Sequence, residues 1–363
     1  MPKTSRPSEA GPVRAEASPR PVLLTGAAGF IGAAVGQKLL AAGTPVVGVD
    51  DLNPYYSPTL KRARLERLVA AAEASGAGFD FRQIDLADRT ACEAVFAAGP
   101  FDRVIHLAAQ AGVRYSLDNP HAYAAANLTG FLNVLEGCRR QAEAGSPPHL
   151  VYASSSSVYG ENPDPVLFVD RPADHPVSLY AATKRANELM AHSYAHLYGL
   201  PCTGVRFFTV YGPWGRPDMA VWKFTERILR GEPIDVYGEG KMRRGFTYVD
   251  DAAEGVVRLA DSPPAAPTNG AAPASPDRGT GPFRTYNLGS REPVELMRLI
   301  EVIESACGRR AEKRFLPMQP GDVVSTAADT APLEKAIGLT PSTPIEEGVG
   351  AFVRWYRDYH GVR

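Results

Sequence analysis

The chain has 363 residues, of which 44% are hydrophobic and 22% charged, and its formal net charge is −1. This composition is that of an ordinary soluble globular protein with room for one large or two unequal domains. Because both signs of charge are interspersed, no basic surface favours nucleic acid or anionic lipid, and we expect neither as a partner. The four cysteines form no Cys-x-x-Cys pair, which favours free thiols in a reducing compartment and no metal site.

Residues 1–19 are rich in Pro, Ser, Ala and charge and lack the apolar centre of a signal peptide. The chain also has no apolar run of about 18 residues or more, the length that a membrane helix needs. The sequence therefore predicts a disordered tail at 1–19, no membrane partner and a cytoplasmic location.

Pro21–Thr25 is a short apolar run, followed at once by the glycines Gly26, Gly29 and Gly32 and then by a helical pattern. A strand, a glycine-rich turn and a helix in succession place a pyrophosphate on a helix N-terminus, since glycine lets the backbone approach the ligand. A plain strand–turn–helix without a ligand is the alternative. The next apolar run ends at Asp50, whose carboxylate is placed to accept hydrogen bonds from an adenosine ribose, which favours NAD over NADP.

Two further strands are expected at 79–84 and 101–109. The first ends in Asp85 and Leu86, a position suited to the adenine edge, and the second ends in small residues that let a cofactor lie across the strand ends. His106 is a tempting base, but inside an apolar strand it is better interpreted as a buried, hydrogen-bonded core residue. Asn127, in a helix expected at 122–141, is a candidate support for the serine-bearing loop described next.

The stretch from Val151 to Lys184 contains a strand, four serines, a proline-rich loop and a helical run with Tyr180 and Lys184 four residues apart. That spacing puts the phenol and the ammonium on one helix face, where a fixed positive charge favours the phenolate and makes Tyr180 a general base. Such a pair also arises by chance. The serines past the carboxyl end of a parallel strand, where ligands bind, favour a catalytic set of serine, tyrosine and lysine.

After a strand at 202–208 the regular alternation of strands and helices stops, so we expect the chain to enter a smaller lobe that covers the substrate. Arg216, Arg243 and Arg244 are candidate diphosphate ligands because a guanidinium grips phosphate oxygens in pairs; solvated surface charges are the alternative. Residues 262–282 are predicted to be a mobile loop. The aromatic stripe of the last helix, which includes Phe352 and Tyr356, is interpreted as core packing.

The predicted fold is α/β: a doubly wound parallel Rossmann sheet with a smaller C-terminal α/β substrate-binding lobe. The NAD-binding part is expected to comprise 20–208 and about 246–290, and the substrate lobe 209–245 and about 291–363.

These motifs resemble the extended short-chain dehydrogenase/reductase family of nucleotide-sugar epimerases and dehydratases. The resemblance extends from residue 21 to about 330 and is carried by the three glycines, Asp50, the His-Leu-Ala-Ala run ending at Ala109, the serines, Tyr180 with Lys184, and 206–213. Stretches at 51–56, 109–116, 175–184, 207–219 and 318–323 are similar to members that invert carbon 4 of UDP-glucuronate. The resemblance implies NAD as a tightly held cofactor, a UDP-sugar substrate, an isomerase reaction and a homodimer.

It also implies roles for individual residues, with Tyr180 as base, Lys184 as its electrostatic partner and ribose ligand, and Ser155 as the hydroxyl that binds the 4-oxygen of the sugar. Cofactor contacts are expected from Gly26, Gly29, Phe30, Ile31, Gly32, Asp50, Asn53, Asp85, Leu86, Leu107, Ala108, Ala109, Asn127, Tyr180, Lys184, Phe207 and Val210. Substrate contacts are expected from Arg114, Ser155, Ser156, Ser157, Thr209, Arg216, Tyr237, Arg244 and Asp322. Gly245 follows Arg244 where the family usually has Asp, which leaves Arg244 less firmly oriented.

Other activities stay open at this point. A non-catalytic NAD-sensing relative is disfavoured by the presence of Tyr180 and Lys184, and a net oxidoreductase by Asp50 and the apparent enclosure of the cofactor. A 4-epimerase of UDP-glucose or UDP-N-acetylglucosamine is the main alternative, and a UDP-glucuronate decarboxylase a weaker one.

Overall fold

The computed structural model describes residues 20–162, 164–266, 277–318 and 325–362. The tail expected at 1–19, residues 267–276 of the loop expected at 262–282, and Asp322 lie outside these ranges.

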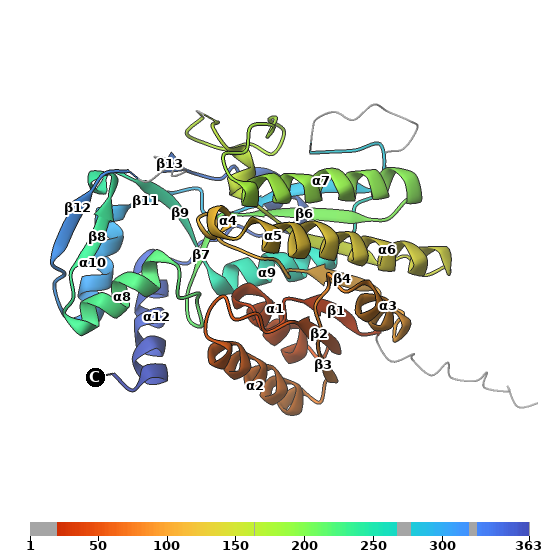
Figure 1. The fold of residues 1–363 in the computed structure, drawn as a ribbon, viewed down its shortest axis with the longest axis horizontal. Coiled ribbons are helices and arrows are strands. Elements are labelled where there is room, and N and C mark those ends of the chain that lie inside the picture. The colour runs from red at the N-terminus through yellow and green to blue at the C-terminus, as the bar shows by residue number, and fades with distance from the viewer. Residues whose placement is uncertain (1–19, 163, 267–276, 319–324, 363) are drawn as a thin grey trace, which may run out of the picture.

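The centre of the fold is a seven-stranded sheet in the order β10-β6-β5-β4-β1-β2-β3, and every neighbouring pair is parallel (Figure 1). The strand order reverses between β1 and β4, so the carboxyl ends of these strands flank the crevice in which open α/β sheets bind ligands. The strands are β1 (Val22–Thr25), β2 (Val46–Asp50), β3 (Phe79–Gln83), β4 (Arg103–His106), β5 (His149–Ser155), β6 (Cys202–Phe207) and β10 (Phe283–Leu288).

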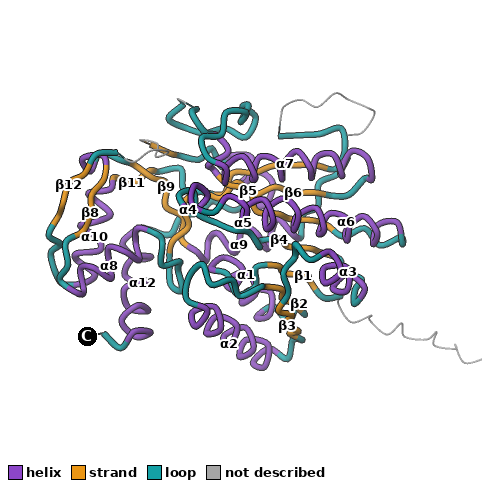
Figure 2. Tube along the Cα trace, in the orientation of Figure 1, coloured by secondary structure: helices purple, strands orange, loops and turns teal. Residues whose placement is uncertain are grey.

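Helices cover both faces of this sheet, each over its own apolar core (Figure 2). One core lies beneath helices that contribute Val35, Leu68 and Val256; the other lies beneath helices that contribute Val95 and Phe131. The first layer is α1 (Phe30–Ala41), α2 (Pro58–Ser75) and α9 (Val249–Ala260), and the second is α3 (Arg89–Ala97), α6 (Gly130–Glu143) and α7 (Leu179–Tyr198). The predicted doubly wound α/β fold is confirmed.

A smaller group of elements lies at one side of the sheet, on the left in Figure 1. Its core includes Phe352 and Tyr356, which are 1% and 3% exposed, so the interpretation of the last helix as core packing is confirmed. The elements are β7 (Thr209–Tyr211), α8 (Ala220–Arg230), β8 (Ile234–Tyr237), β9 (Arg243–Tyr248), β11 (Pro293–Glu295), α10 (Leu296–Cys307), β12 (Lys313–Leu316), β13 (Ser325–Thr326) and α12 (Ile345–His360).

The helix α10 begins at Leu296, directly after Pro293–Glu295, which pairs antiparallel with β9. One helix differs from the sequence prediction. The single helix expected at 122–141 is interrupted: a short α5 (Pro120–Tyr123) runs into a π-helical turn at Ala124–Thr129 before α6. Asn127 lies in that turn, and π-helical turns occur frequently at functional sites. The remaining short helices are α4 (Tyr115–Asp118) and α11 (Ala331–Ile337).

Within the described ranges, no helix combines the length and apolar character that crossing a membrane requires. Nor does this part of the chain contain a group of three or more His, Cys, Asp or Glu residues arranged to hold a metal ion.

Candidate active site

The turn between β1 and α1 is built so closely that side chains are excluded from it. Gly26 has φ +72°, and a Cβ there would lie 2.7 Å from the Ala108 amide nitrogen. A Cβ on Gly32 would lie 1.9 Å from the Gly26 carbonyl oxygen. Gly29 begins α1 without a side-chain cap, so the first amides of the helix remain available to an anion. This cradle fits a dinucleotide pyrophosphate.

Asp50 ends β2 and holds the same turn from the side. Its carboxylate accepts hydrogen bonds from the Ala28 amide (3.1 Å) and the Leu52 amide (2.9 Å), and Lys61 lies 3.8 Å away. Burial raises the pKa of Asp50, and the Lys61 ammonium opposes that rise. A ribose would therefore meet a carboxylate that is already oriented.

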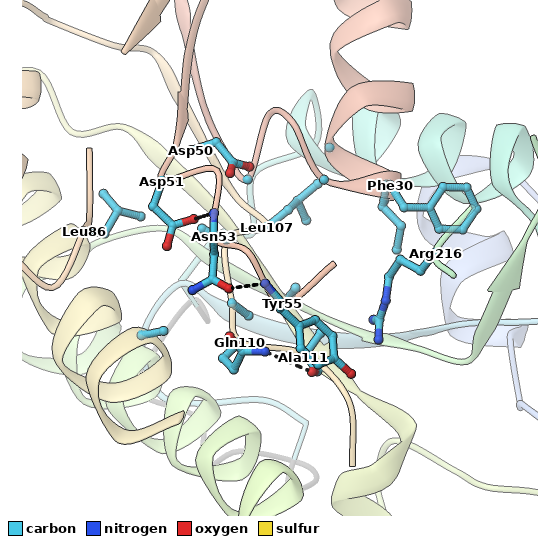
Figure 3. A pocket seen from close by; sticks show the side chains of 18 of the residues that line it. Phe30, Asp50, Asp51, Asn53, Tyr55, Leu86, Leu107, Gln110, Ala111 and Arg216 are labelled. Carbon is cyan, nitrogen blue, oxygen red and sulfur yellow. Dashed lines mark hydrogen bonds between the residues drawn. The ribbon is translucent and has the colours of Figure 1, made fainter. Parts of the chain in front are cut away.

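A cavity of about 430 Å³ opens over these strand ends. Figure 3 shows Asp50, Asp51 and Asn53 on one side of it, Phe30 and Arg216 on the other, and Tyr55 between them. Every predicted cofactor residue lines this cavity except Asn127. Sequence reasoning missed other lining residues, among them Tyr55, Tyr56, Lys61, Gln110 and Met219. Their proximity in sequence to predicted cofactor residues could have indicated three of them, because Tyr55 and Tyr56 follow closely after Asp50 and Gln110 follows Ala109.

Asn127 is buried behind the wall of the cavity. Its side-chain oxygen accepts from the Gln110 amide at 2.8 Å, and its nitrogen donates to the Gln110 carbonyl at 3.1 Å and to the Thr183 hydroxyl at 3.0 Å. The expectation that it supports the serine loop was wrong, since it fixes the segment after β4 against α7.

Tyr180, Lys184 and Ser155 lie together at the cavity, from α7 and the end of β5. Ser178 caps α7 by accepting from the Ala181 amide, which sets the start of the helix at Leu179, one residue before Tyr180. The Lys184 ammonium is 2% exposed and donates to the Ala153 carbonyl at 2.9 Å. Burial lowers the pKa of Lys184 to about 8.

The pKa of Tyr180 differs from the sequence prediction. Burial raises the pKa of its phenol, while hydrogen bonding with Ser155 and the charge of Arg216 act in the opposite direction. The expectation that Lys184 lowers the pKa of Tyr180 does not hold in the structure. The groups that oppose the effect of burial are Ser155 and Arg216, which sequence spacing did not connect with Tyr180.

The predicted substrate residues are more dispersed. Ser155 and Arg216 line the cavity, and Arg216 donates to Asp218 through Nε at 3.0 Å. Arg114 and Tyr237 meet each other, with the guanidinium 5.7 Å from the ring centre. Arg114 and Tyr237 lie outside the cavity lining, and so do the other described candidates. These are Ser156 and Ser157 in the turn after β5, Thr209 in β7 and Arg244 in β9; the diphosphate candidate Arg243 also lies in β9.

His106 is buried, and its Nδ1 lies 2.8 Å from the Thr25 hydroxyl, within hydrogen-bond distance. Burial lowers its pKa to about 3. The interpretation of His106 as a hydrogen-bonded core residue is confirmed.

A doubly wound sheet with a glycine cradle, an acid after the second strand, and a tyrosine and lysine beside the cavity defines a dinucleotide-dependent enzyme of the Rossmann class. The model of the NAD dependent epimerase/dehydratase family matches residues 22–273. The chain belongs to this family, as the motifs predicted.

Individual relatives are similar to this chain over nearly its whole length. The sequence is 56% identical to an uncharacterized 37.6 kDa protein of Escherichia coli O111:H-, over 94% of this chain and 99% of the relative. It is 51% identical to a probable UDP-glucuronate 4-epimerase of Rhizobium meliloti (strain 1021), over 92% and 96% of the two chains. A crystal structure of UDP-glucuronic acid 4-epimerase from Bacillus cereus, in complex with UDP-glucuronic acid and NAD, superimposes with a TM-score of 0.80 at 29% identity, over 93% and 99%.

The crowding at Gly32 generates a first prediction. Gly32→Ala should lower the free energy of unfolding by about 1–3 kcal/mol, because the added methyl overlaps the Gly26 carbonyl, and should abolish NAD retention. Gly350→Ala is the matched control, since Gly350 is also helical and its Cβ meets only the end of the Arg354 side chain. Alanine there should stabilise by up to about 1 kcal/mol. Urea unfolding and NAD content measure both, and equal behaviour of the two variants would refute the steric argument.

The buried ammonium of Lys184 generates a second prediction. Between pH 8 and 10.5 the unfolded chain holds a proton on this lysine that the folded chain has lost, so stability gains a contribution as pH rises through that window. Lys184→Met should therefore be more stable than the native chain at pH 7, by on the order of 1–3 kcal/mol, with the advantage shrinking towards pH 10.5. Urea unfolding against pH measures this, with Lys223→Met at an exposed position as control. Parallel curves for native chain and Lys184→Met would contradict the prediction.

Proposed function

We propose that the chain is an isomerase that interconverts UDP-glucuronate and UDP-galacturonate by inversion at carbon 4, with NAD as resident cofactor. The observation that carries this is the placement of Tyr180, Ser155 and Lys184 on the wall of a dinucleotide cavity. The identity of 51% with the Rhizobium meliloti relative supports the uronate as substrate.

The proposed chemistry divides between cofactor and protein. NAD, when bound, supplies a reversible hydride acceptor beside carbon 4. Tyr180 removes the proton of the 4-hydroxyl and returns it after the sugar has turned over, while Ser155 holds the 4-oxygen. Lys184 donates to the Ala153 carbonyl, which fixes its charge at the cavity that Tyr180 also lines and in which the ribose is expected. Residues expected to hold the cofactor are Gly26, Gly29, Gly32 and Asp50.

A uronate adds a constraint, because its 4-keto form is a β-keto acid that readily loses carbon dioxide. The carboxylate must be held where its bond to carbon 5 cannot align with the ketone. Hydroxyl donors suit this task, and we assign it to Ser156, Ser157 and Thr209. Acidic residues at 156 and 157 would repel the carboxylate and supply groups for elimination. Their absence supports epimerisation over decarboxylation or dehydration.

A homodimer and a cytoplasmic location are part of the same proposal. Apolar side chains on the outer faces of α6 and α7 support pairing through these helices. They are Leu132 at 41%, Leu189 at 55% and Leu197 at 67% exposure.

The role of Tyr180 leads to a third prediction. Tyr180→Phe should reduce turnover at least about 100-fold, because only the proton-transferring hydroxyl is removed, while NAD remains bound. Tyr198→Phe is a matched control on the same helix, since Tyr198 is exposed and far along α7. Rates are followed by chromatography of the UDP-sugars. Wild-type turnover by the Tyr180 variant would eliminate Tyr180 as the base.

The substrate is tested directly by incubating the enzyme with UDP-glucuronate and following products by NMR. UDP-galacturonate without a pentose is the expected product. UDP-xylose or a 4-keto pentose would identify a decarboxylase instead. Inertness towards UDP-glucuronate alongside activity on UDP-glucose or UDP-N-acetylglucosamine would establish the neutral-sugar alternative.

A further inference from the structure

Arg64 of α2 is completely buried, yet within the described residues it has no carboxylate among its hydrogen-bond acceptors. Its guanidinium has five N–H groups, and each has an acceptor. Nε and Nη2 donate to the Trp214 carbonyl at 3.1 and 2.6 Å, and Nη2 also donates to the Gly215 carbonyl at 2.9 Å. Nη1 donates to the Ala28 carbonyl at 3.0 Å and to the Tyr56 hydroxyl at 2.7 Å.

A buried charge without a counterion is costly, so an apolar side chain of similar size would serve packing better. What distinguishes Arg64 is the pair of segments that it joins. Ala28 belongs to the glycine turn, whose amide on the other side is held by Asp50. Trp214 and Gly215 belong to the loop between β7 and α8, which also carries Arg216. One planar group therefore connects the cofactor cradle to the substrate side of the cavity.

The loop is shaped to meet this guanidinium. Trp214 has φ +63°, a backbone conformation that residues other than glycine rarely adopt. Its own carbonyl and the carbonyl of Gly215 both accept hydrogen bonds from Arg64. The indole is held separately, with its ring centre 5.2 Å from that of Trp355 and 5.4 Å from that of Tyr359 in α12. The strained backbone thus has α2 on one side and α12 on the other.

A second hydrogen bond joins the cofactor side of the cavity to the loop between β7 and α8. The Tyr55 hydroxyl donates to Asp218 at 3.2 Å, and Asp218 accepts from Arg216. Tyr55 lies in the segment after β2 that also presents Asn53 to the cavity, and Figure 3 shows it between the Asp50 side and Arg216. Arg64 and Tyr55 therefore join the two walls between which a dinucleotide would lie.

We propose that Arg64 is a positioning residue that fastens the glycine turn to the 212–219 loop, while Tyr55 fastens the segment after β2 to the same loop. Together they keep NAD enclosed between turnovers and hold Arg216 in place. The inference rests on the proposed function, since epimerisation involves no net oxidation and loss of the cofactor midway would strand a keto sugar. Retention and substrate binding would then depend on the same contact.

The test uses the holoenzyme and the charge-conserving variant Arg64→Lys, whose ammonium has only three donors and no planar fork. Released NAD is trapped with a coupled dehydrogenase, and its release should be at least ten-fold faster than from the native enzyme. The KM for UDP-glucuronate should rise at least three-fold, more than kcat falls. Arg62→Lys, an exposed arginine on the same helix, should match the native enzyme in both measurements.

Urea unfolding and circular dichroism separate this role from a purely structural one. A folded Arg64→Lys enzyme with native NAD release and native KM overturns the proposal, whatever its stability. If that variant does not fold, Tyr55→Phe decides, since it removes one hydroxyl; NAD release should be two- to five-fold faster, and unchanged release overturns the proposal. NAD release is measured without a UDP-sugar. The release rates can therefore be interpreted even if UDP-glucuronate is not the substrate.

Discussion

The turn after β1 is packed tightly against the residues that follow β4, and the cofactor side of the cavity depends on this packing. The backbone at Gly26 leaves no room for a side chain against Ala108, and Gly32 must pass its own turn at a distance that excludes even a methyl group. Because this packing excludes side chains at Gly26 and Gly32, the backbone itself lines the cavity at these two positions. The two polar groups of Ala28 are then held from opposite directions, its amide by Asp50 and its carbonyl by Arg64.

Several buried charged side chains lie near the cavity. Burying them reduces the stability of the fold, but it fixes the positions of the side chains and backbone segments that form the site. Among the described residues, the Lys184 ammonium donates to one neutral partner, the Ala153 carbonyl, and Arg64 donates to carbonyls and a hydroxyl. Glu188, one further turn along α7, accepts from Arg206 of β6 at 2.8 and 2.9 Å and from the Ser154 hydroxyl at 2.6 Å. This ion pair joins α7, β5 and β6, and it therefore sets how Tyr180 faces the serine run. Replacing such pairs with apolar residues often stabilises a protein, so their presence here indicates selection for geometry.

The electrostatics of Tyr180 illustrate the limit of reasoning from spacing. A lysine one helical turn away predicts a lowered phenol pKa, but the phenol is also desolvated, and its pKa is raised. The opposing contributions come from Ser155, 25 positions before it along the chain, and Arg216, 36 positions after it. Helical spacing singled out Tyr180 and Lys184, but it could not predict whether the pKa of Tyr180 is raised or lowered. That direction depends on desolvation, and desolvation depends on every segment that covers the site.

Local patterns in the sequence were sufficient for the doubly wound sheet, the glycine cradle, the position of Asp50, and the presence of Tyr180 and Lys184 on one helix beside the cavity. Each of these depends on short-range rules: the periods of strand and helix, the steric freedom of glycine, and the position of residues just past a strand end. Only the tertiary structure decided that Asn127 supports Gln110, that Arg114 meets Tyr237, and that Arg64 joins Ala28 to Trp214. Those contacts cross from 17 to 150 positions of sequence, and no periodicity encodes them, because the packing of separate elements determines which buried donors and acceptors can meet.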